Sequence, residues 1–258
     1  MDHFRFGDGK KTLVIIPGLS VQSVMGSADA VAEEYAIFAK DFSVYLFDRR
    51  RDLPQKYTVY DMADDTAEAI ENLGLKDVYL FGASQGGMIA MCIALRFPHL
   101  VRKLALCSTA PEVSGDRMSV IDEWTDLAER GDAAGLYGSF AKKVYPASVY
   151  EQYSPALGLL ASSVTEEELD RFIILAEGTK GFDVSDKLRS LMCPVLAAGS
   201  EDDEVLGGDA IHKMIGLLSD TEGFESIIYN GYGHAAYDTA PDFRERLYAF
   251  FTQEQTPE

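Results

Sequence analysis

Ser84 lies in the stretch Val78–Met91, VYLFGASQGGMIAM, where a β-branched and aromatic run gives way to an apolar segment rich in Ala and Met. The pentapeptide around it, Gly-Ala-Ser-Gln-Gly, matches the pattern G-x-S-x-G at a junction where a strand is expected to turn into a helix. Small residues suit such a turn, because side chains at Gly82 or Gly86 would collide with neighbouring strand and helix backbone. The pattern predicts that the Ser84 hydroxyl projects above the sheet edge, where it could act as a nucleophile.

Taken alone, the pentapeptide also fits a Gly-rich strand-to-helix turn without chemistry, or a loop that binds phosphate. The phosphate alternative is weak, because the chain has no Walker-type Lys-Ser/Thr pair and no G-x-G-x-x-G motif. The nucleophile hypothesis therefore depends on whether the chain also supplies a base.

A serine hydroxyl is a poor nucleophile unless a base removes its proton, so Ser84 would need a positioned histidine. His3 lies near the N-terminus, His99 ends the helix predicted after Ser84, and His212 lies in a helix-like stretch. His234 differs from these, because it follows IIYNGYG, a predicted strand with a Gly-rich exit. It is therefore expected at the carboxyl end of a strand, where open α/β sheets place their sites, and we predict that it is the base.

A catalytic histidine needs a carboxylate that fixes its tautomer and stabilises the imidazolium. The stretch PVLAAGSEDDEV is a predicted strand that ends in an acidic cluster of Glu201, Asp202, Asp203 and Glu204. Such a cluster is usually a solvated turn. Here it lies between the candidate serine and the candidate histidine, which gives the chain order serine, acid, histidine expected for this kind of site.

Strand-like and helix-like segments alternate along most of the chain. The strand-like segments are short runs that are apolar on both faces, which fits a parallel sheet covered by helices on each side; they are KTLVIIPG, FSVYLFD, DVYLFGA, VRKLALCST, CPVLAAGS and ESIIYNGYG. A helix is predicted after Thr58, because Thr58 and Asp61 have capping-box spacing and the apolar periodicity that follows ends at Gly74. The alternation predicts the α/β class.

This alternation stops between about Glu112 and Leu188, where only helix-like segments occur. One of them opens with Thr165 and Glu168 at capping-box spacing. We therefore predict a core of residues 1–112 and 189–258, with a helical cap, or lid, of residues 113–188 inserted between two late strands.

Composition limits the classes of partner. A chain of 258 residues with 47% hydrophobic residues can form one globular domain, and a net charge of -19 argues against binding to nucleic acid or an anionic membrane. The longest apolar run is far shorter than the roughly 20 residues needed to span a bilayer. Cys92, Cys107 and Cys193 lie in apolar contexts without CxxC spacing, so we predict buried reduced thiols and no metal site. We expect a soluble cytoplasmic protein that binds neither nucleic acid nor membrane. The sequence does not determine its oligomeric state.

With these motifs in place, the chain resembles α/β-hydrolase fold proteins of the esterase, lipase and enol-lactonase type. The similarity runs from IIPG at Ile15 to Pro241, with the inserted helices in the place of the family's variable cap. It implies a mostly parallel central sheet flanked by helices. It also implies a serine hydrolase that needs no cofactor.

The resemblance implies a role for each catalytic residue. GASQGG matches the nucleophile elbow, which makes Ser84 the nucleophile, and GYGH matches the loop of the catalytic histidine, His234. The family's Gly-x-x-Asp spacing, counted from Gly199, selects Asp202 as the acid over its neighbour Asp203.

The resemblance also implies an oxyanion hole of two backbone N–H groups, which belong here to Leu19 and Gln85. The chain departs from the family by having Pro17-Gly18 where His-Gly is common, and by having three arginines, Arg49 to Arg51, where the family has a Gly-containing loop. We expect these arginines to form surface ion pairs, each of small energetic value, with a binding patch as the alternative.

The expected substrate is a small to medium, largely neutral molecule with an ester, lactone or thioester bond. Many aromatic residues occur in the predicted cap, and ligand pockets are commonly lined by such residues, so the candidates for substrate binding are Trp124, Tyr137 and Phe140. Two other classes stay open on the same scaffold. One is a non-hydrolytic enzyme, such as a lyase that uses the triad to abstract a proton, and the other is a ligand-binding signalling protein.

Overall fold

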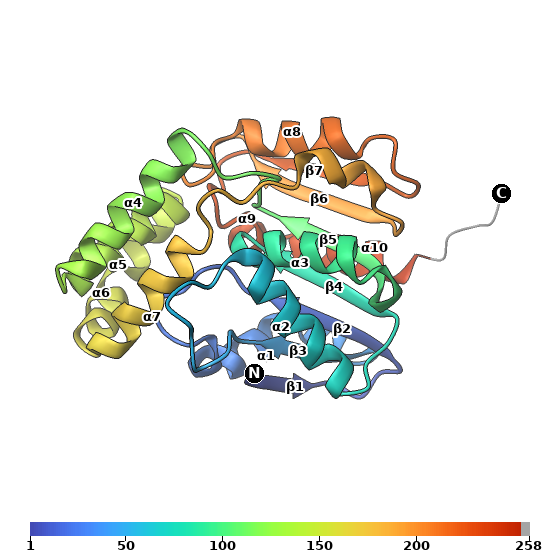
Figure 1. The fold of residues 1–258 in the computed structure, drawn as a ribbon, viewed down its shortest axis with the longest axis horizontal. Helices are drawn as coiled ribbons and strands as arrows, with labels where there is room; N and C mark the ends of the chain where they lie inside the picture. Colours follow the sequence, from blue (N-terminus) through green and yellow to red (C-terminus); the bar gives the residue numbers. More distant parts are fainter. Residues whose placement is uncertain (254–258) are drawn as a thin grey trace.

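A seven-stranded sheet runs through the centre of the protein in the computed structural model, which describes residues 1–253 (Figure 1). The spatial order of the strands is β1-β3-β2-β4-β5-β6-β7, and only β1 runs antiparallel to its neighbour. Their bounds are β1 His3–Phe6, β2 Lys11–Ile16, β3 Phe42–Phe47, β4 Val78–Ala83, β5 Val101–Cys107, β6 Val195–Ser200 and β7 Glu225–Tyr229. The predicted mostly parallel α/β sheet is confirmed.

Helices cover both faces of this sheet. The helices are α1 Ala28–Glu34, α2 Val59–Asn72, α3 Gln85–Arg96, α4 Asp116–Glu129, α5 Ala133–Val144, α6 Ala147–Ser162, α7 Glu166–Glu177, α8 Asp209–Leu218, α9 Ala236–Thr239 and α10 Phe243–Thr252. Buried side chains of α2, α3 and α8 share one hydrophobic cluster, and those of α1, α9 and α10 share a second cluster with the other face of the strands. Two layers of helices therefore enclose the sheet, as expected for parallel strands that are apolar on both faces.

The predicted capping boxes at the starts of α2 and α7 are both present. In α2, the Thr58 side chain accepts a hydrogen bond from the Asp61 N–H, and the Asp61 carboxylate accepts one from the Thr58 N–H. Thr165 and Glu168 make the same reciprocal pair at α7. These caps satisfy N–H groups that a helix start leaves without partners, which is why their sequence spacing located the helix starts.

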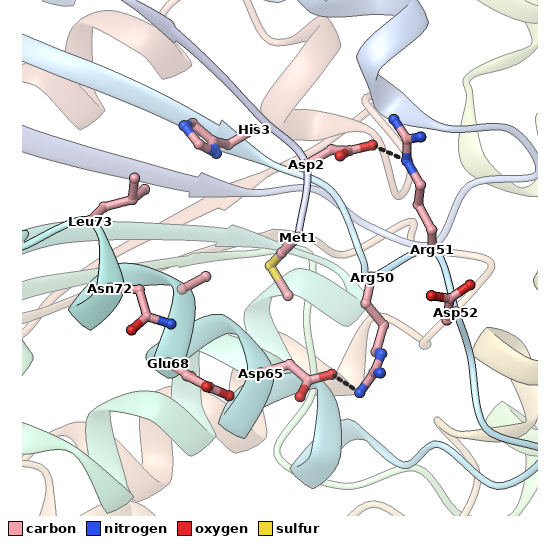
Figure 2. A pocket seen from close by; sticks show the side chains of 11 residues that line it. Met1, Asp2, His3, Arg50, Arg51, Asp52, Asp65, Glu68, Asn72 and Leu73 are labelled. Atoms are coloured by element: carbon pink, nitrogen blue, oxygen red, sulfur yellow. Dashed lines mark hydrogen bonds and ion pairs between the residues drawn. The ribbon is translucent and has the colours of Figure 1, made fainter.

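The N-terminal strand closes one edge of the sheet. Near this edge, Arg51 forms an ion pair of 2.7 Å with Asp2, and Arg50 forms one of 3.4 Å with Asp65 of α2 (Figure 2). Both arginine side chains are exposed to solvent, so the expected surface ion pairs are found for these two residues.

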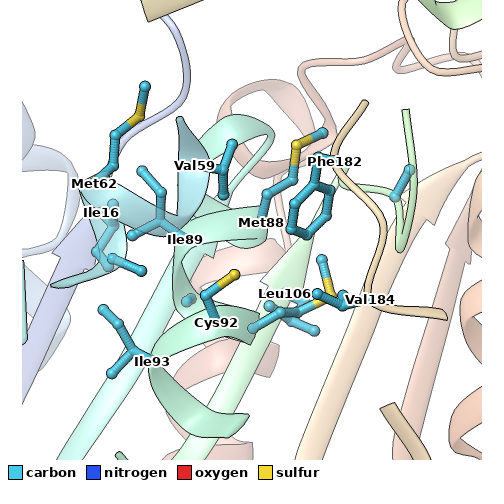
Figure 3. Close-up of a cluster of buried hydrophobic side chains, with 14 of the residues drawn as sticks. Ile16, Val59, Met62, Met88, Ile89, Cys92, Ile93, Leu106, Phe182 and Val184 are labelled. Carbon is cyan, nitrogen blue, oxygen red and sulfur yellow. The ribbon is translucent and has the colours of Figure 1, made fainter. Parts of the chain in front are cut away.

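The larger hydrophobic cluster lies between α2, α3 and the strands. Figure 3 shows Met88 and Cys92 of α3, Met62 of α2 and Leu106 of β5 in this cluster, all at most 1% exposed. Phe182, from the segment after α7, lies beside Met88 in the same cluster (Figure 3). The helix that follows Ser84 is thus fixed on several sides by core packing.

All three cysteines are free and buried, as predicted. Burial in apolar surroundings raises the pKa of the Cys92 and Cys107 thiols to about 12 and that of Cys193 to about 11. These side chains are therefore neutral thiols at physiological pH and poor nucleophiles.

Helices α4 to α7 lie between β5 and β6 in the chain and gather beyond one end of the sheet (Figure 1). The segments that lead into and out of this group pair antiparallel where Glu112 meets Asp183, with the Val113 N–H donating to the Phe182 carbonyl at 2.8 Å. We call α4 to α7 the cap helices; the exact boundaries 113 and 188 stay a prediction. Within residues 1–253, no helix combines the length and the apolar character that crossing a membrane requires.

We predict that Gly86→Ala destabilises the protein, because a Cβ atom at this position would collide with the carbonyl oxygens of Ile16, the last residue of β2, and of Pro17, which follows it. Overpacking of this kind costs about 1–3 kcal/mol of unfolding free energy. Gly216→Ala in α8 is the matched control, since its Cβ atom would meet open space, and alanine in a helix stabilises by up to about 1 kcal/mol. Urea unfolding of both variants checks this, and an unchanged Gly86→Ala midpoint would contradict it.

Candidate active site

Ser84 is the single residue between β4 and α3, and its backbone adopts φ 53° and ψ -124°. A non-glycine residue with positive φ carries strain of about 1–3 kcal/mol, so it persists only when the surroundings hold it. Here the Ser84 N–H donates to the Cys107 carbonyl at 2.9 Å, and the Thr109 hydroxyl donates to the Ser84 carbonyl at 2.8 Å. The end of β5 thus holds the peptide groups on both sides of the serine.

Glycines allow the backbone to close in around Ser84. A Cβ atom on Gly82 would collide with the Gly86 carbonyl, and one on Gly86 with β2, which confirms the predicted reason for both glycines. On the opposite side, a Cβ atom on Gly18 would lie 3.2 Å from the Ser84 Cβ atom and 3.7 Å from its Oγ atom. The loop after β2 therefore passes directly beside the serine hydroxyl.

His234 follows β7 and is only 2% exposed. Its Nδ1 atom lies 2.8 Å from the Oδ2 atom of Asp203, which is also buried. The other carboxylate oxygen of Asp203 accepts hydrogen bonds from the N–H groups of Val205 and Leu206, at 2.8 and 2.9 Å. With the Nδ1 proton directed at Asp203, the Nε2 atom of His234 is the ring nitrogen that can accept a proton.

The prediction that Asp202 is the partner of His234 is wrong, because the carboxylate that reaches the imidazole belongs to Asp203. Asp202 is exposed and instead accepts hydrogen bonds from the N–H groups of Gly231, at 3.0 Å, and Gly233, at 3.1 Å. Strand β6 continues to Ser200, and the turn after it directs Asp202 toward the glycine backbone and the next residue toward the ring. The Gly-x-x-Asp spacing counted from Gly199 could not tell which of the two aspartates faces the imidazole.

The environment of Asp203 favours its charged form. Burial acts to raise the pKa of this carboxyl, but attraction to His234 and the hydrogen bonds from His234, Leu206 and Val205 together hold its pKa below the ordinary value. The carboxylate is therefore ionised at neutral pH, and it can fix the histidine ring and stabilise a positive charge on it.

The two predicted oxyanion donors belong to segments that adjoin Ser84. Gln85 is the first residue of α3, so its N–H has no acceptor within the helix. Leu19 follows Gly18 in the loop beside the serine, and its N–H donates in none of the hydrogen bonds found within residues 1–253. The catalytic role of both N–H groups stays a prediction.

Arg49 is the residue that the sequence argument misplaced. It was expected on the surface with Arg50 and Arg51, but it is 4% exposed and lies beneath the loop after β2. Its Nη2 atom donates to the Pro17 carbonyl at 2.8 Å and to the Gln85 side-chain oxygen at 3.2 Å. The available signal was its position two residues after the end of β3, since the carboxyl ends of parallel strands meet at the same sheet edge as Ser84.

The predicted substrate-binding aromatics all lie on the cap helices. Trp124 is 3% exposed, packs against Phe140 with ring centroids 4.6 Å apart, and donates from its indole N–H to Ser139. Tyr137 is half-buried, and its hydroxyl donates to the Gln22 side chain in the loop after β2. Trp124 and Phe140 thus form part of the packing of the cap, and contact of any of the three with substrate stays a prediction.

Within residues 1–253, no cluster of three or more His, Cys, Asp or Glu side chains is suited to hold a metal ion. The chemistry that this edge of the sheet can supply comes from a hydroxyl, an imidazole paired with a carboxylate, and backbone N–H groups. These are the groups of acyl transfer through a covalent serine intermediate.

Comparison with known sequences agrees with this architecture. A family model described as alpha/beta hydrolase fold matches residues 11–241. A relative from Serratia proteamaculans, named Putative carbamate hydrolase RutD, is 24% identical over 90% of this chain and 89% of its own length. The mouse protein named Serine hydrolase BPHL is 25% identical over 52% of this chain and 50% of its own length.

Solved structures share the whole fold. An alpha/beta hydrolase enzyme from a Medee basin deep-sea metagenome library superposes with a TM-score of 0.86 at 22% identity, covering 100% of this chain and 96% of the other. The enol-lactonase from Burkholderia xenovorans LB400 superposes with a TM-score of 0.82 at 17% identity, covering 98% and 96%. From its sequence and from its sheet, elbow and cap helices alike, the chain is a member of the alpha/beta hydrolase fold family.

Proposed function

We propose that this protein is a serine hydrolase that cleaves carboxylic ester, lactone or thioester bonds in small to medium, largely neutral substrates. The observation that carries the proposal is the strained Ser84 backbone at the β4–α3 junction, on a sheet edge that also bears a buried His234–Asp203 pair. Strain of this kind concentrates at functional sites. The hydrolase names of the relatives support the reaction class.

The proposed reaction begins when the Ser84 hydroxyl oxygen attacks the substrate carbonyl carbon and passes its proton to His234 Nε2. The carbonyl oxygen becomes an oxyanion, which the N–H groups of Leu19 and Gln85 stabilise. Collapse of this intermediate breaks the bond to the leaving group, which takes the proton from His234 and leaves an acyl group on Ser84. Water then repeats the attack with His234 as base, which releases the acid and restores the serine.

Asp203 contributes by orienting the imidazole and by balancing the positive charge that forms on it. Asp202 has a different task in this scheme, because its carboxylate binds the N–H groups of Gly231 and Gly233 and so holds the loop that carries His234. The neighbouring carboxylates thus act on the same histidine, one through its ring and one through its backbone.

A carbamate is the second candidate substrate class, favoured by relatives that match about nine-tenths of this chain and carry a carbamate hydrolase name. A carbamate has the same electrophilic carbonyl as an ester, with nitrogen in place of one carbon substituent, so the same residues would act on it. Esters remain the first proposal because the carbamate nitrogen donates electron density to the carbonyl, which makes its carbon a weaker electrophile than that of an ester.

We predict that a fluorophosphonate probe labels the wild-type protein and fails to label Ser84→Ala, because only an activated serine hydroxyl attacks the probe. Hydrolysis of ester, lactone, thioester or carbamate substrates should fall by about 10³-fold or more in the same variant. Ser190→Ala is the control, since its exposed hydroxyl contacts only the Lys187 carbonyl. Labelling that persists in Ser84→Ala would contradict the assignment, and labelling without turnover of any ester-like bond would favour the lyase or binding alternatives.

We predict that Asp203→Asn lowers kcat by about 10⁴-fold, because an amide at this position favours the wrong histidine tautomer. Asp202→Asn should keep kcat within about tenfold and lower the melting temperature by a few degrees, because it weakens a backbone hydrogen bond worth about 1 kcal/mol. Steady-state kinetics and thermal melts of both variants make the comparison. A larger kcat loss in Asp202→Asn would show that the carboxylate on the ring is not the catalytic one.

We predict that kcat/KM is higher for a neutral ester than for the same ester carrying two added carboxylates, because the net charge of -19 repels polyanions. The difference should shrink as salt rises from 20 to about 500 mM, since salt screens repulsion between exposed charges. A preference for the dianionic ester that is lost at high salt would contradict the prediction.

A further inference from the structure

We propose that Arg49 is a positioning residue that holds the two arms of the oxyanion hole at a fixed separation; the inference rests on the proposed function. One guanidinium nitrogen, Nη2, donates to the carbonyl of Pro17 at 2.8 Å and to the side-chain oxygen of Gln85 at 3.2 Å. Pro17 lies two residues before Leu19, which carries one proposed N–H donor, and Gln85 carries the other. A single side-chain atom therefore links both arms.

The Gln85 side chain is held from its other end as well. Its Nε2 atom donates to the Leu175 carbonyl at 2.7 Å and to the Thr179 hydroxyl at 2.6 Å, at the C-terminal end of α7. Gln85 is 2% exposed, and all of these bonds are shielded from water. The side chain of the residue after Ser84 thus has one orientation, set jointly by Arg49 and by a cap helix.

The burial of the Arg49 guanidinium is not explained by an ion pair with a carboxylate. Within residues 1–253, it donates to no carboxylate, and its Nε atom is buried without a hydrogen-bond partner. Its neighbour Asp48 accepts from Arg171 at 2.8 Å, from Ser23 at 2.5 Å and from the Arg49 backbone N–H. Burying a charge against neutral acceptors costs folding free energy. We therefore attribute the buried guanidinium of Arg49 to a role in the site and not to a gain in stability.

Arg49 keeps its charge in this setting. Burial lowers the pKa of its guanidinium to about 10, and the charge of Asp48 acts against that shift. The group therefore remains protonated at neutral pH and can donate to both acceptors at once.

The arrangement matters for the transition state more than for substrate binding. An oxyanion needs both donors at about 2.7–3.1 Å, and the negative charge on the oxygen forms only as the serine attacks. If the link is lost, the Pro17–Leu19 loop can move relative to α3 while both N–H groups remain present. Such a change lowers kcat and leaves KM nearly constant.

The test compares Arg49→Met, which keeps the aliphatic length and removes the donors, with Arg50→Met as the matched control. Arg50 is adjacent in sequence, but it forms an exposed ion pair with Asp65 (Figure 2). We expect kcat of Arg49→Met to fall about 10²-fold with KM within about threefold, as for loss of an oxyanion donor, and Arg50→Met to match wild type. A trifluoromethyl ketone, which mimics the tetrahedral oxyanion, should lose affinity in parallel with kcat/KM.

Gln85→Met keeps the backbone N–H and removes the side-chain acceptor for Arg49 together with the donors to Leu175 and Thr179, so it breaks the same link if Arg49→Met folds poorly. Both single variants should lower kcat, and the double variant should lower it by less than the product of the two effects, because both break the hydrogen bond between Arg49 and Gln85. Additive effects, a folded Arg49→Met variant with wild-type kcat, or a rise in KM alone would each overturn the proposal. Failure of the proposed function is distinct, because wild-type protein would then show neither Ser84 labelling nor turnover.

Discussion

The backbone conformation of Ser84 is the constraint on which the rest of this site depends. Ser84, with φ 53°, connects β4 directly to α3, and the helix starts close to the backbone of the neighbouring strand β2. That approach is possible because Gly82 and Gly86 leave space where any Cβ atom would collide with backbone, and because apolar side chains of α3 anchor the helix in the core. The strain at one residue is thus offset by burial over a whole helix.

The same close packing brings the other loops of the site into range. Strands β2, β4, β5 and β6 are neighbours in the sheet, so the segments that follow them converge on a single edge. The loop after β2 touches Ser84 through Gly18, the segment after β5 holds its carbonyl through Thr109, and the turn after β6 carries Asp203. Parallel topology is therefore what gathers residues that are more than a hundred positions apart in the chain.

Sequence reasoning succeeded where one local physical signal determines the structure. Each of these signals acts over a few residues. Capping boxes predicted the helix starts, apolar runs predicted most strands, and glycines that allow close backbone approach predicted the Ser84 turn. It failed where the outcome depends on directions set by distant segments. Asp202 and Asp203 are chemically identical neighbours, and only the placement of the β7 loop decides which one meets the imidazole. Arg49 has the same residue type as its exposed neighbours, and only its contact with the loop after β2 shows that it is buried.

The cap helices are joined to each of the three loops that carry the proposed catalytic residues. At the end of α7, Leu175 and Thr179 bind the side chain of Gln85, which follows Ser84. The carbonyl at the end of α5 accepts from the Ala235 N–H, directly after His234, at 2.9 Å. In α4, Arg117 donates to the Leu206 carbonyl, three residues after Asp203, at 2.6 Å.

A rigid movement of the whole cap would therefore break a hydrogen bond beside every proposed catalytic residue, which would cost stability and disturb the site together. Helix α6 is the exception, because it takes part in none of these three connections and Ala161 is its one buried residue. Its Leu159 side chain is 75% exposed, so little apolar packing holds the helix in place. Helices α4, α5 and α7 are thus tied by hydrogen bonds to the loops of the proposed catalytic residues, whereas α6 is not tied to them by any of these three bonds.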